Sequence, residues 1–159
     1  MFKRSVILFL AITIMIFAFA GSALAVSGAG AIILEFPIGA RGNALGESGT
    51  ALIQDATSIW WNPAGLAFAG DTYRGQFHAM HSKLVPDLAD DIYLSWVGYT
   101  SQVAGGNFAV STTYLSMGEQ IATDDSGDPR GKFTSYMFSC STAYGSRLSQ
   151  NTGFGIGVK

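Results

Sequence analysis

Two groups of side chains are of types that bind metal ions, but in neither group are the residues spaced as the ligands of a metal site are. His78 and His81 are three residues apart in a segment that alternates like a β-strand, so their side chains are expected on opposite faces of a sheet. Residues 124–128 place three aspartates around Gly127. They resemble a calcium loop, but the spacing differs and no glutamate closes it. We therefore expect no metal site, with His78 in a row of polar side chains and residues 124–128 in a solvated loop.

No arrangement of residues indicates catalysis. Cys140 is the only cysteine, which excludes an intramolecular disulfide and any CxxC metal or redox motif. Ser139 and Ser141 flank it, but no recognisable motif places a base beside either hydroxyl. The glycine-rich stretch at 39–46 lacks the Gly-Lys-Ser/Thr sequence that completes a phosphate-binding loop. The sequence predicts a protein that is not an enzyme and holds no cofactor.

An asparagine–proline string is the most specific pattern in the chain. Residues 62–66 read Asn-Pro-Ala-Gly-Leu and follow a glycine-rich stretch, Gly-Ala-Arg-Gly-Asn-Ala-Leu-Gly, at 39–46. Pro63 fixes its own φ, and Asn62 can cap the turn with its side chain. Gly65 can take a positive φ that other residues avoid. The string predicts a rigid turn.

The first 25 residues predict an export signal. Lys3 and Arg4 precede an apolar run at 6–20, and cleavage is expected near Ala25, after Ala-Leu-Ala. A membrane anchor is the alternative, but the run is shorter than the roughly 20 residues that cross a bilayer. Removing the signal changes the formal net charge from −2 to about −4. Because the chain has no basic stripe, nucleic-acid binding is not expected.

From residue 73 onward, side chains alternate with a period of two. One face carries large apolar side chains and the other small or polar ones, over segments near 73–80, 92–97, 108–114, 135–144 and 153–158. On the second segment, Leu94 and Trp96 belong to the large face and Ser95 to the small one. A soluble sandwich buries the large face, whereas a membrane barrel turns it to lipid. Alternation alone leaves both open.

Composition and connections favour the barrel. Charged residues make up 13% of the chain, about half of their share in soluble domains. The short connections at 101–106 and 146–152 alternate with longer ones at 82–91 and 118–132, as periplasmic turns and external loops do in outer-membrane barrels. Tyrosines at strand ends also suit an interfacial girdle.

Residues 28–159 resemble outer-membrane proteins of the PorV/PorQ family, relatives of FadL-type transporters of long-chain fatty acids. The stretch at 39–66 is similar to the family's amino-terminal plug. The matching plug residues are Gly39, Arg41, Gly42, Gly46, Asp55, Trp61, Asn62, Pro63, Ala64, Gly65 and Leu66.

The resemblance implies an all-β fold, the N-terminal part of a transmembrane antiparallel β-barrel. Residues 26–70 would form a plug containing a short helix, and 71–159 the first strands, about five. Because about eight strands are needed to close a barrel, and the chain stops at Lys159 within a strand, we expect the remaining strands beyond Lys159.

Within the plug, residues 50–60 are expected to form the short helix, with Ala51, Leu52 and Ile59 inward and Asp55 outward. Trp60 and Trp61 would pack the plug against the wall. Arg41 would be a buried charge that needs a partner or a function. We expect it to pair with a wall carboxylate and hold the plug, or with a ligand carboxylate.

The family likeness implies a non-enzymatic protein of the cell outer membrane that contacts lipid and serves type IX secretion. It would bind secreted proteins through their C-terminal signal domain, using loops 82–91 and 118–132, and work with other secretion components. One alternative is a FadL-like channel for fatty acids or other hydrophobic small molecules, gated by 39–66. Small polar side chains expected inward argue against such a conduit: Ser95, Ser111, Thr113, Ser135 and Ser139. A mainly structural envelope protein is a third hypothesis.

Overall fold

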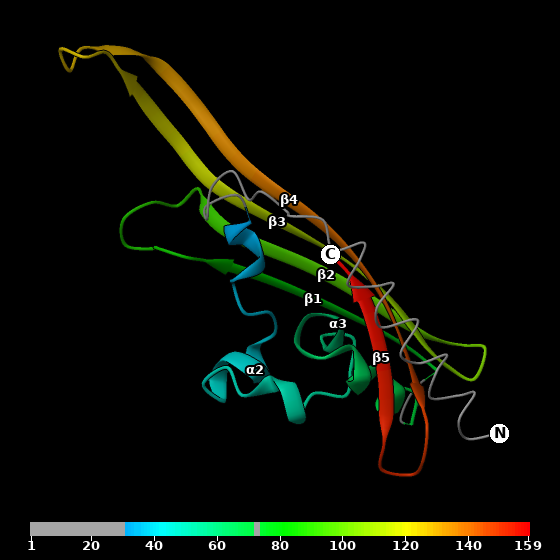
Figure 1. Cartoon of the computed structure of the whole chain (residues 1–159). Helices are drawn as coiled ribbons and strands as arrows, with labels where there is room; N and C mark the ends of the chain where they lie inside the picture. Colours follow the sequence, from blue (N-terminus) through cyan, green and yellow to red (C-terminus); the bar gives the residue numbers. More distant parts are fainter. Residues whose placement is uncertain (1–30, 72–73) are drawn as a thin grey trace, which may run out of the picture. The chain divides into compact units, whose positions relative to one another are not determined.

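The fold is an antiparallel β-meander with a series of short helices on one face. The computed structural model describes residues 31–71 and 74–159 (Figure 1). The predicted export signal at 1–25 lies outside them. The strands follow in chain order, each antiparallel to the next: β1 (Gly75–Lys83), β2 (Ile92–Val103), β3 (Gly106–Thr123), β4 (Pro129–Arg147) and β5 (Gly153–Val158). The predicted antiparallel sheet of about five strands is confirmed, and β1 and β5 are its edges within these residues.

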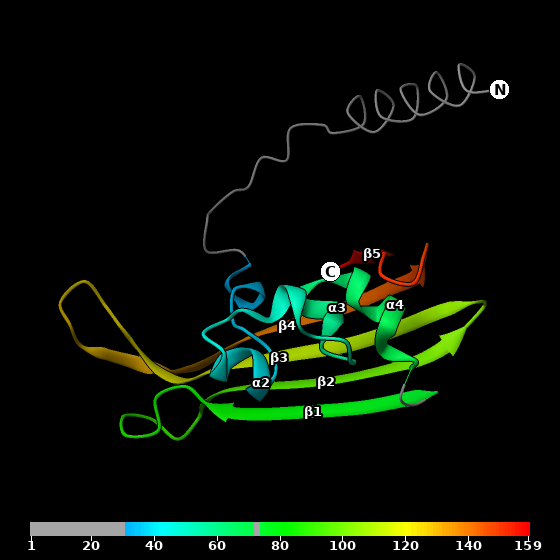
Figure 2. The ribbon, with the colours of Figure 1, turned by 90° about the horizontal axis from the view of Figure 1, so that it is seen from below.

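Short helices occupy the chain before the sheet. They are η1 (Ile32–Leu34), α2 (Ala40–Ala44), η2 (Gly49–Ala51), α3 (Ser58–Trp61), η3 (Pro63–Gly65) and α4 (Leu66–Ala69). No helix in the described ranges is long and apolar enough to span a membrane. We call residues 33–70 the plug segment. Figure 2 shows α2, α3 and α4 on the same side of the sheet, which we call its inner face.

The predicted single helix over residues 50–60 is wrong, because local side-chain bonds divide it into η2 and α3. Asp55 Oδ1 accepts hydrogen bonds from the backbone N–H of Thr57 at 2.8 Å and from its hydroxyl at 2.6 Å. Ser58 Oγ donates to the carbonyl of Ile53 at 3.0 Å. These short polar side chains therefore satisfy backbone groups in a turn that a continuous helix would exclude.

The turn also changes which side chains of this stretch are buried. Ile59 is buried as predicted, but Ala51 is exposed and Leu52 is 61% exposed. Asp55 is half-buried rather than outward-facing. Ile53 and Ala56 take the core positions instead, because the break between the two helices rotates the second one.

The inner face has the predicted small and polar side chains on β3, β4 and β5, but not on β2. Leu94 and Trp96 are buried beneath the plug segment, with Trp96 only 1% exposed. The predicted orientation of β2 is therefore wrong: Ser95 points to the outer face, where its Oγ lies 2.9 Å from His81 Nδ1. Pairing of Trp96 with Thr113 fixes this orientation, and Gly98 leaves the space that the Trp96 ring fills.

The long connection predicted at 118–132 is mostly paired strand, which corrects that prediction. β3 continues to Thr123 and β4 begins at Pro129, so the hairpin extends beyond β1 and β2 (Figure 1). The register shifts between Ser116 and Glu119, where Gly118 has a φ of 72°. A bulge of this kind interrupts the alternation of side chains with a period of two. The residues beyond it therefore do not continue the pattern that predicts a strand.

The orientation of β2 predicts effects of very different size for two adjacent substitutions. Leu94→Ala should lower the free energy of unfolding by about 2–5 kcal/mol, because it leaves a cavity beneath the plug segment. Ser95→Ala, on the outer face, should change it by less than about 0.5 kcal/mol. Denaturant unfolding of the protein in detergent micelles measures both. A small effect of Leu94→Ala together with a large effect of Ser95→Ala would contradict the observed orientation of β2 and favour the one predicted from the sequence.

Candidate functional site: the plug segment and its seat

Asn62 organises the turn that ends the plug segment. Its backbone is extended, with φ −161° and ψ 105°, and its Oδ1 accepts a hydrogen bond from the N–H of Ala64 at 3.1 Å. Its Nδ2 donates to the carbonyl of Thr50 at 3.1 Å. Pro63 stands at the first helical position, where a missing N–H breaks no bond. The side chain of Asn62 therefore caps η3 and also ties it to η2.

The positive φ predicted for Gly65 is wrong. The turn needs a glycine here because there is no space for a side chain. Its φ is −62°, which any residue can adopt. A Cβ at this position would lie 2.5 Å from the carbonyl oxygen of Ile53 and 2.8 Å from Ser58 Oγ. The turn therefore packs directly on the backbone that precedes α3.

The turn rests on a row of glycines that project no side chain from the sheet. We call Gly145, Gly153, Gly155 and Gly157 the glycine seat. A Cβ at Gly155 would lie 2.2 Å from the carbonyl carbon of Pro63, and one at Gly145 would lie 2.6 Å from the Pro63 oxygen. Gly145 and Gly155 are partners across β4 and β5. The backbone of the turn thus lies directly against the backbone of two strands.

Polar side chains of the strands hold the carbonyls of α4. Asn107, which is buried, donates from Nδ2 to the carbonyl of Leu66 at 2.7 Å. Gln76 of β1 donates from Nε2 to the carbonyl of Ala69 at 2.6 Å. A short helix leaves such carbonyls without partners of its own. The strands therefore bind the plug segment through the groups that its helix cannot satisfy.

An ion pair and an aromatic contact close the end of the plug segment. Arg147 of β4 pairs with Asp71, and its Cζ lies 4.7 Å from the centre of the Phe68 ring. Both partners are partly exposed, so the ion pair by itself adds little stability. It links β4 to Asp71, just after the end of α4.

Trp61 joins the two halves of the plug segment. Its ring lies over Gly42 and Gly49, where a Cβ would come within 2.4 Å and 2.6 Å of ring atoms. Its Nε1 donates to the carbonyl of Ile38 at 2.8 Å. Gly39, just before α2, has a φ of 90°, which favours glycine. Gly42 and Gly49 therefore allow close packing around Trp61, and Gly39 allows the turn into α2.

Two open cavities lie between the plug segment and β1. They measure about 510 Å³ and 330 Å³, and Arg41, Asp55 and His78 line both. Arg41 forms no ion pair with any acidic residue in 31–71 or 74–159, so the predicted bond to a wall carboxylate is not found there. Arg41 is exposed, so the predicted buried charge at this position is wrong, and it lines both cavities together with His78.

The two histidines lie on opposite faces, as predicted from their spacing. His78 is half-buried on the inner face, while His81 lies 5.1 Å from Tyr93, centre to centre, on the outer face. No group of three metal-ligating side chains occurs in the part of the chain that the structure describes.

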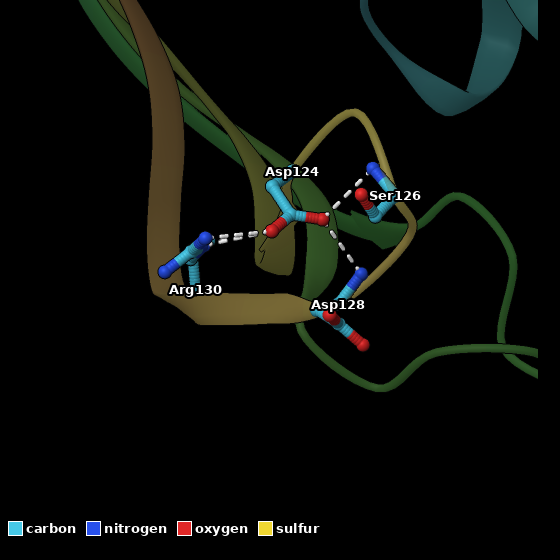
Figure 3. Close-up of polar contacts among 4 residues, drawn as sticks. All are labelled: Asp124, Ser126, Asp128 and Arg130. Carbon is cyan, nitrogen blue, oxygen red and sulfur yellow. Dashed lines mark hydrogen bonds and ion pairs between the residues drawn. The ribbon is translucent and has the colours of Figure 1, made fainter.

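The aspartates at 124–128 build a turn (Figure 3). Asp124 Oδ1 accepts hydrogen bonds from the N–H groups of Ser126 at 3.0 Å and Asp128 at 2.9 Å. Its Oδ2 accepts from Arg130 Nε at 3.0 Å. The hydrogen bond from the backbone of Asp128, together with those from Arg130 and Ser126, lowers the pKa of Asp124. The carboxylate is thus used to close the hairpin.

The sequence missed Trp96, Asn107 and Gly145 as residues of the site. Asn107 comes just after a two-residue turn, and an asparagine near a turn is usually explained by the turn itself. Trp96 and Gly145 belong to strands in which the pattern reports only which face a side chain occupies. Their contacts with the plug segment join positions far apart in the chain, and no local spacing reveals them.

The glycine seat predicts that a single added methyl group displaces the turn. Gly155→Ala should lower the free energy of unfolding by about 1–3 kcal/mol, because the methyl group meets the rigid backbone of Pro63. Gly75→Ala is the matched control. Its methyl group comes close only to the flexible end of the Tyr99 side chain, and the nearest backbone atom, the Thr100 oxygen, is at an ordinary contact distance of 3.7 Å, so we expect a change below about 0.5 kcal/mol. Denaturant titration in micelles compares them. Equal stability of the two variants would refute the direct contact.

Comparison with known proteins places the chain in a family. The model of the family described as type IX secretion system protein PorV matches residues 24–158. No curated protein and no solved structure matches the chain, and the relation to FadL-type transporters stays a prediction. Because the match covers nearly the whole sequence, the chain belongs to the PorV family of type IX secretion system proteins.

Proposed function

We propose that this protein is a non-enzymatic component of the outer membrane that binds secreted proteins for type IX secretion. Membership of the PorV family supports the secretion role. The observation that carries the membrane location is the outer face of the sheet. There, every strand exposes large apolar side chains. This face lies opposite the side on which Figure 2 shows the helices of the plug segment.

The outer face has the composition of a surface in contact with lipid. Phe77 is 67% exposed and Ile156 61% exposed, and other exposed apolar side chains on this face are Val97, Tyr99, Phe108, Val110, Phe138, Phe154 and Val158. Soluble monomers rarely expose a continuous apolar patch of this extent. β1 has 9 residues, within the roughly 9–11 residues of a tilted transmembrane strand, and β2 with 12 is slightly longer. We propose that lipid covers the outer face of the sheet.

A row of rings crosses four strands at one end of this apolar band. His81, Tyr93, Tyr114 and Tyr136 follow one another from β1 to β4, with centre-to-centre distances of 5.1, 6.1 and 5.8 Å. Tyrosine rings gather at the level of lipid head groups because one end is apolar and the other polar. We propose that this row marks one boundary of the membrane.

Beyond the row, the hairpin of β3 and β4 becomes polar. Lys132 pairs with Glu119, and Arg130 pairs with Asp124 at the tip. Asp91, from the connection between β1 and β2, accepts a hydrogen bond from the N–H of Glu119 at 2.6 Å and so braces the base of this hairpin. We call residues 118–133 the arm. A braced, charged hairpin beyond the aromatic row is suited to water and to contact with another protein.

We propose the arm and the neighbouring residues 84–91 as the surface that binds the C-terminal signal domain of secreted proteins. The arm exposes two large apolar side chains, Ile121 and Phe133, between its charged ones. Aromatic side chains surrounded by polar ones often dominate the energy of a protein interface. The proposal includes closure of the sheet into a barrel, which requires β1 and β5 each to pair with a further strand.

Cargo binding predicts different effects for two exposed apolar residues. Phe133→Ser in the arm should weaken binding of a purified C-terminal signal domain about tenfold, the loss of one interface anchor. Leu148→Ser is the matched control, because Leu148 is also exposed but lies in the connection to β5 at the other end of the sheet. Surface plasmon resonance with the protein in nanodiscs measures both affinities. Unchanged binding by Phe133→Ser, or an equal loss in Leu148→Ser, would remove the arm from the proposal.

A further inference from the structure

We propose that the free edge of β3 in the arm binds an extended segment of a secreted protein as an added β-strand. This inference rests on the proposed role in secretion and deepens it, because it states how the arm recognises its partner. The edge is the side of β3 that faces away from β4, over residues 119–123, beyond the point where β2 ends. An extended peptide backbone carries donors and acceptors at the spacing that such an edge requires.

β2 covers the edge of β3 only in part. Their pairing ends at Ile92, which lies opposite Met117. The residues before Ile92 belong to the turn toward β1, where the N–H of Leu84 donates to the carbonyl of Ile92 at 3.0 Å. β3 continues to Thr123 and is paired there with β4 alone. Within 31–71 and 74–159, this part of the arm therefore has no neighbouring strand on its second side (Figure 1).

One hydrogen bond shows which backbone groups face this edge. Asp91 lies directly before β2, and its Oδ2 accepts from the N–H of Glu119 at 2.6 Å, so this N–H points away from β4. Backbone groups alternate between the two sides of a strand. The N–H and the carbonyl of Ile121 therefore face the same edge, whereas those of Gln120 face β4 at Phe133. No turn or loop backbone hydrogen bond involves Ile121 in the ranges that the structure describes.

Little protects this edge from an added strand. Proteins commonly protect free edges with charges, bulges or a covering segment. Here Asp91 covers only the N–H of Glu119, and the charge of Glu119 is balanced by Lys132. Ile121 is 63% exposed, and its β-branched side chain is suited to pair with an apolar side chain across strands. Shifts in the register with β4 flank the regular stretch at 119–122, so the added strand is a short one.

Hydrogen exchange, followed residue by residue by NMR in the full chain in micelles, tests the added strand. In the free protein, the amide proton of Ile121 should exchange faster than that of Gln120, which is bonded to β4. A saturating amount of a purified C-terminal signal domain should slow exchange at Ile121 at least about tenfold. Exchange at Gln120 should change much less, because its hydrogen bond exists before binding.

Two substitutions at one position separate the backbone from the side chain. Ile121→Pro removes the N–H at the edge, where proline is tolerated because no bond to β4 is lost. It should weaken binding of the signal domain at least about tenfold. Ile121→Ala is the matched control, because it keeps the N–H, and it should change the Kd by less than about threefold. Slow exchange at Gln120 in Ile121→Pro checks that the arm stays folded.

The outcomes distinguish the added strand from the proposed function. Formation of the complex without slower exchange at Ile121, or equal Kd values for Ile121→Pro and the unchanged protein, would overturn the added strand and leave the secretion role standing. Equal losses in Ile121→Pro and Ile121→Ala would also overturn it, because the contact would then depend on the side chain. Absence of any complex with the signal domain would overturn both proposals.

Discussion

The structure depends on direct contact between the backbone of one turn and the backbone of two strands. Pro63 lies on Gly145 and Gly155, and no side chain separates them. This approach brings Leu66 into the core and places Asn107 within reach of its carbonyl. The contact depends on shape at the scale of single methyl groups. It fixes the position of the plug segment more strictly than hydrophobic burial alone would.

This one-sided contact divides the sheet into two unlike faces. The inner face is covered by the plug segment. It carries mostly small or polar side chains, but Leu94, Trp96 and Leu115 are buried on it. The outer face keeps its phenylalanines and valines exposed, together with Tyr99 and Tyr136. At about 25 cal/mol for each Å² of apolar surface, such exposure to water is costly. A bilayer removes that cost without any further protein layer.

The sequence predicted the elements that obey a simple period and missed those set by contacts. The alternating strands were found because side chains on a strand repeat every two residues. The orientation of β2 was not, because Trp96 and Val97 are adjacent large residues and only pairing with β3 decides between them. The helix expected at 50–60 failed where Asp55 binds its own neighbours. The strand beyond Gly118 was read as a loop because a bulge shifts the period there. The cavity at Arg41 depends on packing between distant segments, which no local pattern contains.

The central claim, that the outer face contacts lipid, can be measured with the natural cysteine. Cys140 lies on the outer face of β4, in the middle of the apolar band, and its side chain is exposed. In proteoliposomes, a membrane-impermeant maleimide should label it at least about ten times more slowly than a cysteine introduced by Ser126→Cys in a Cys140→Ser background, because the water-soluble reagent does not enter the hydrocarbon core of the bilayer. Detergent that dissolves the bilayer should reduce the difference in labelling rate between the two cysteines. Equal labelling of both cysteines in intact membranes would contradict the account.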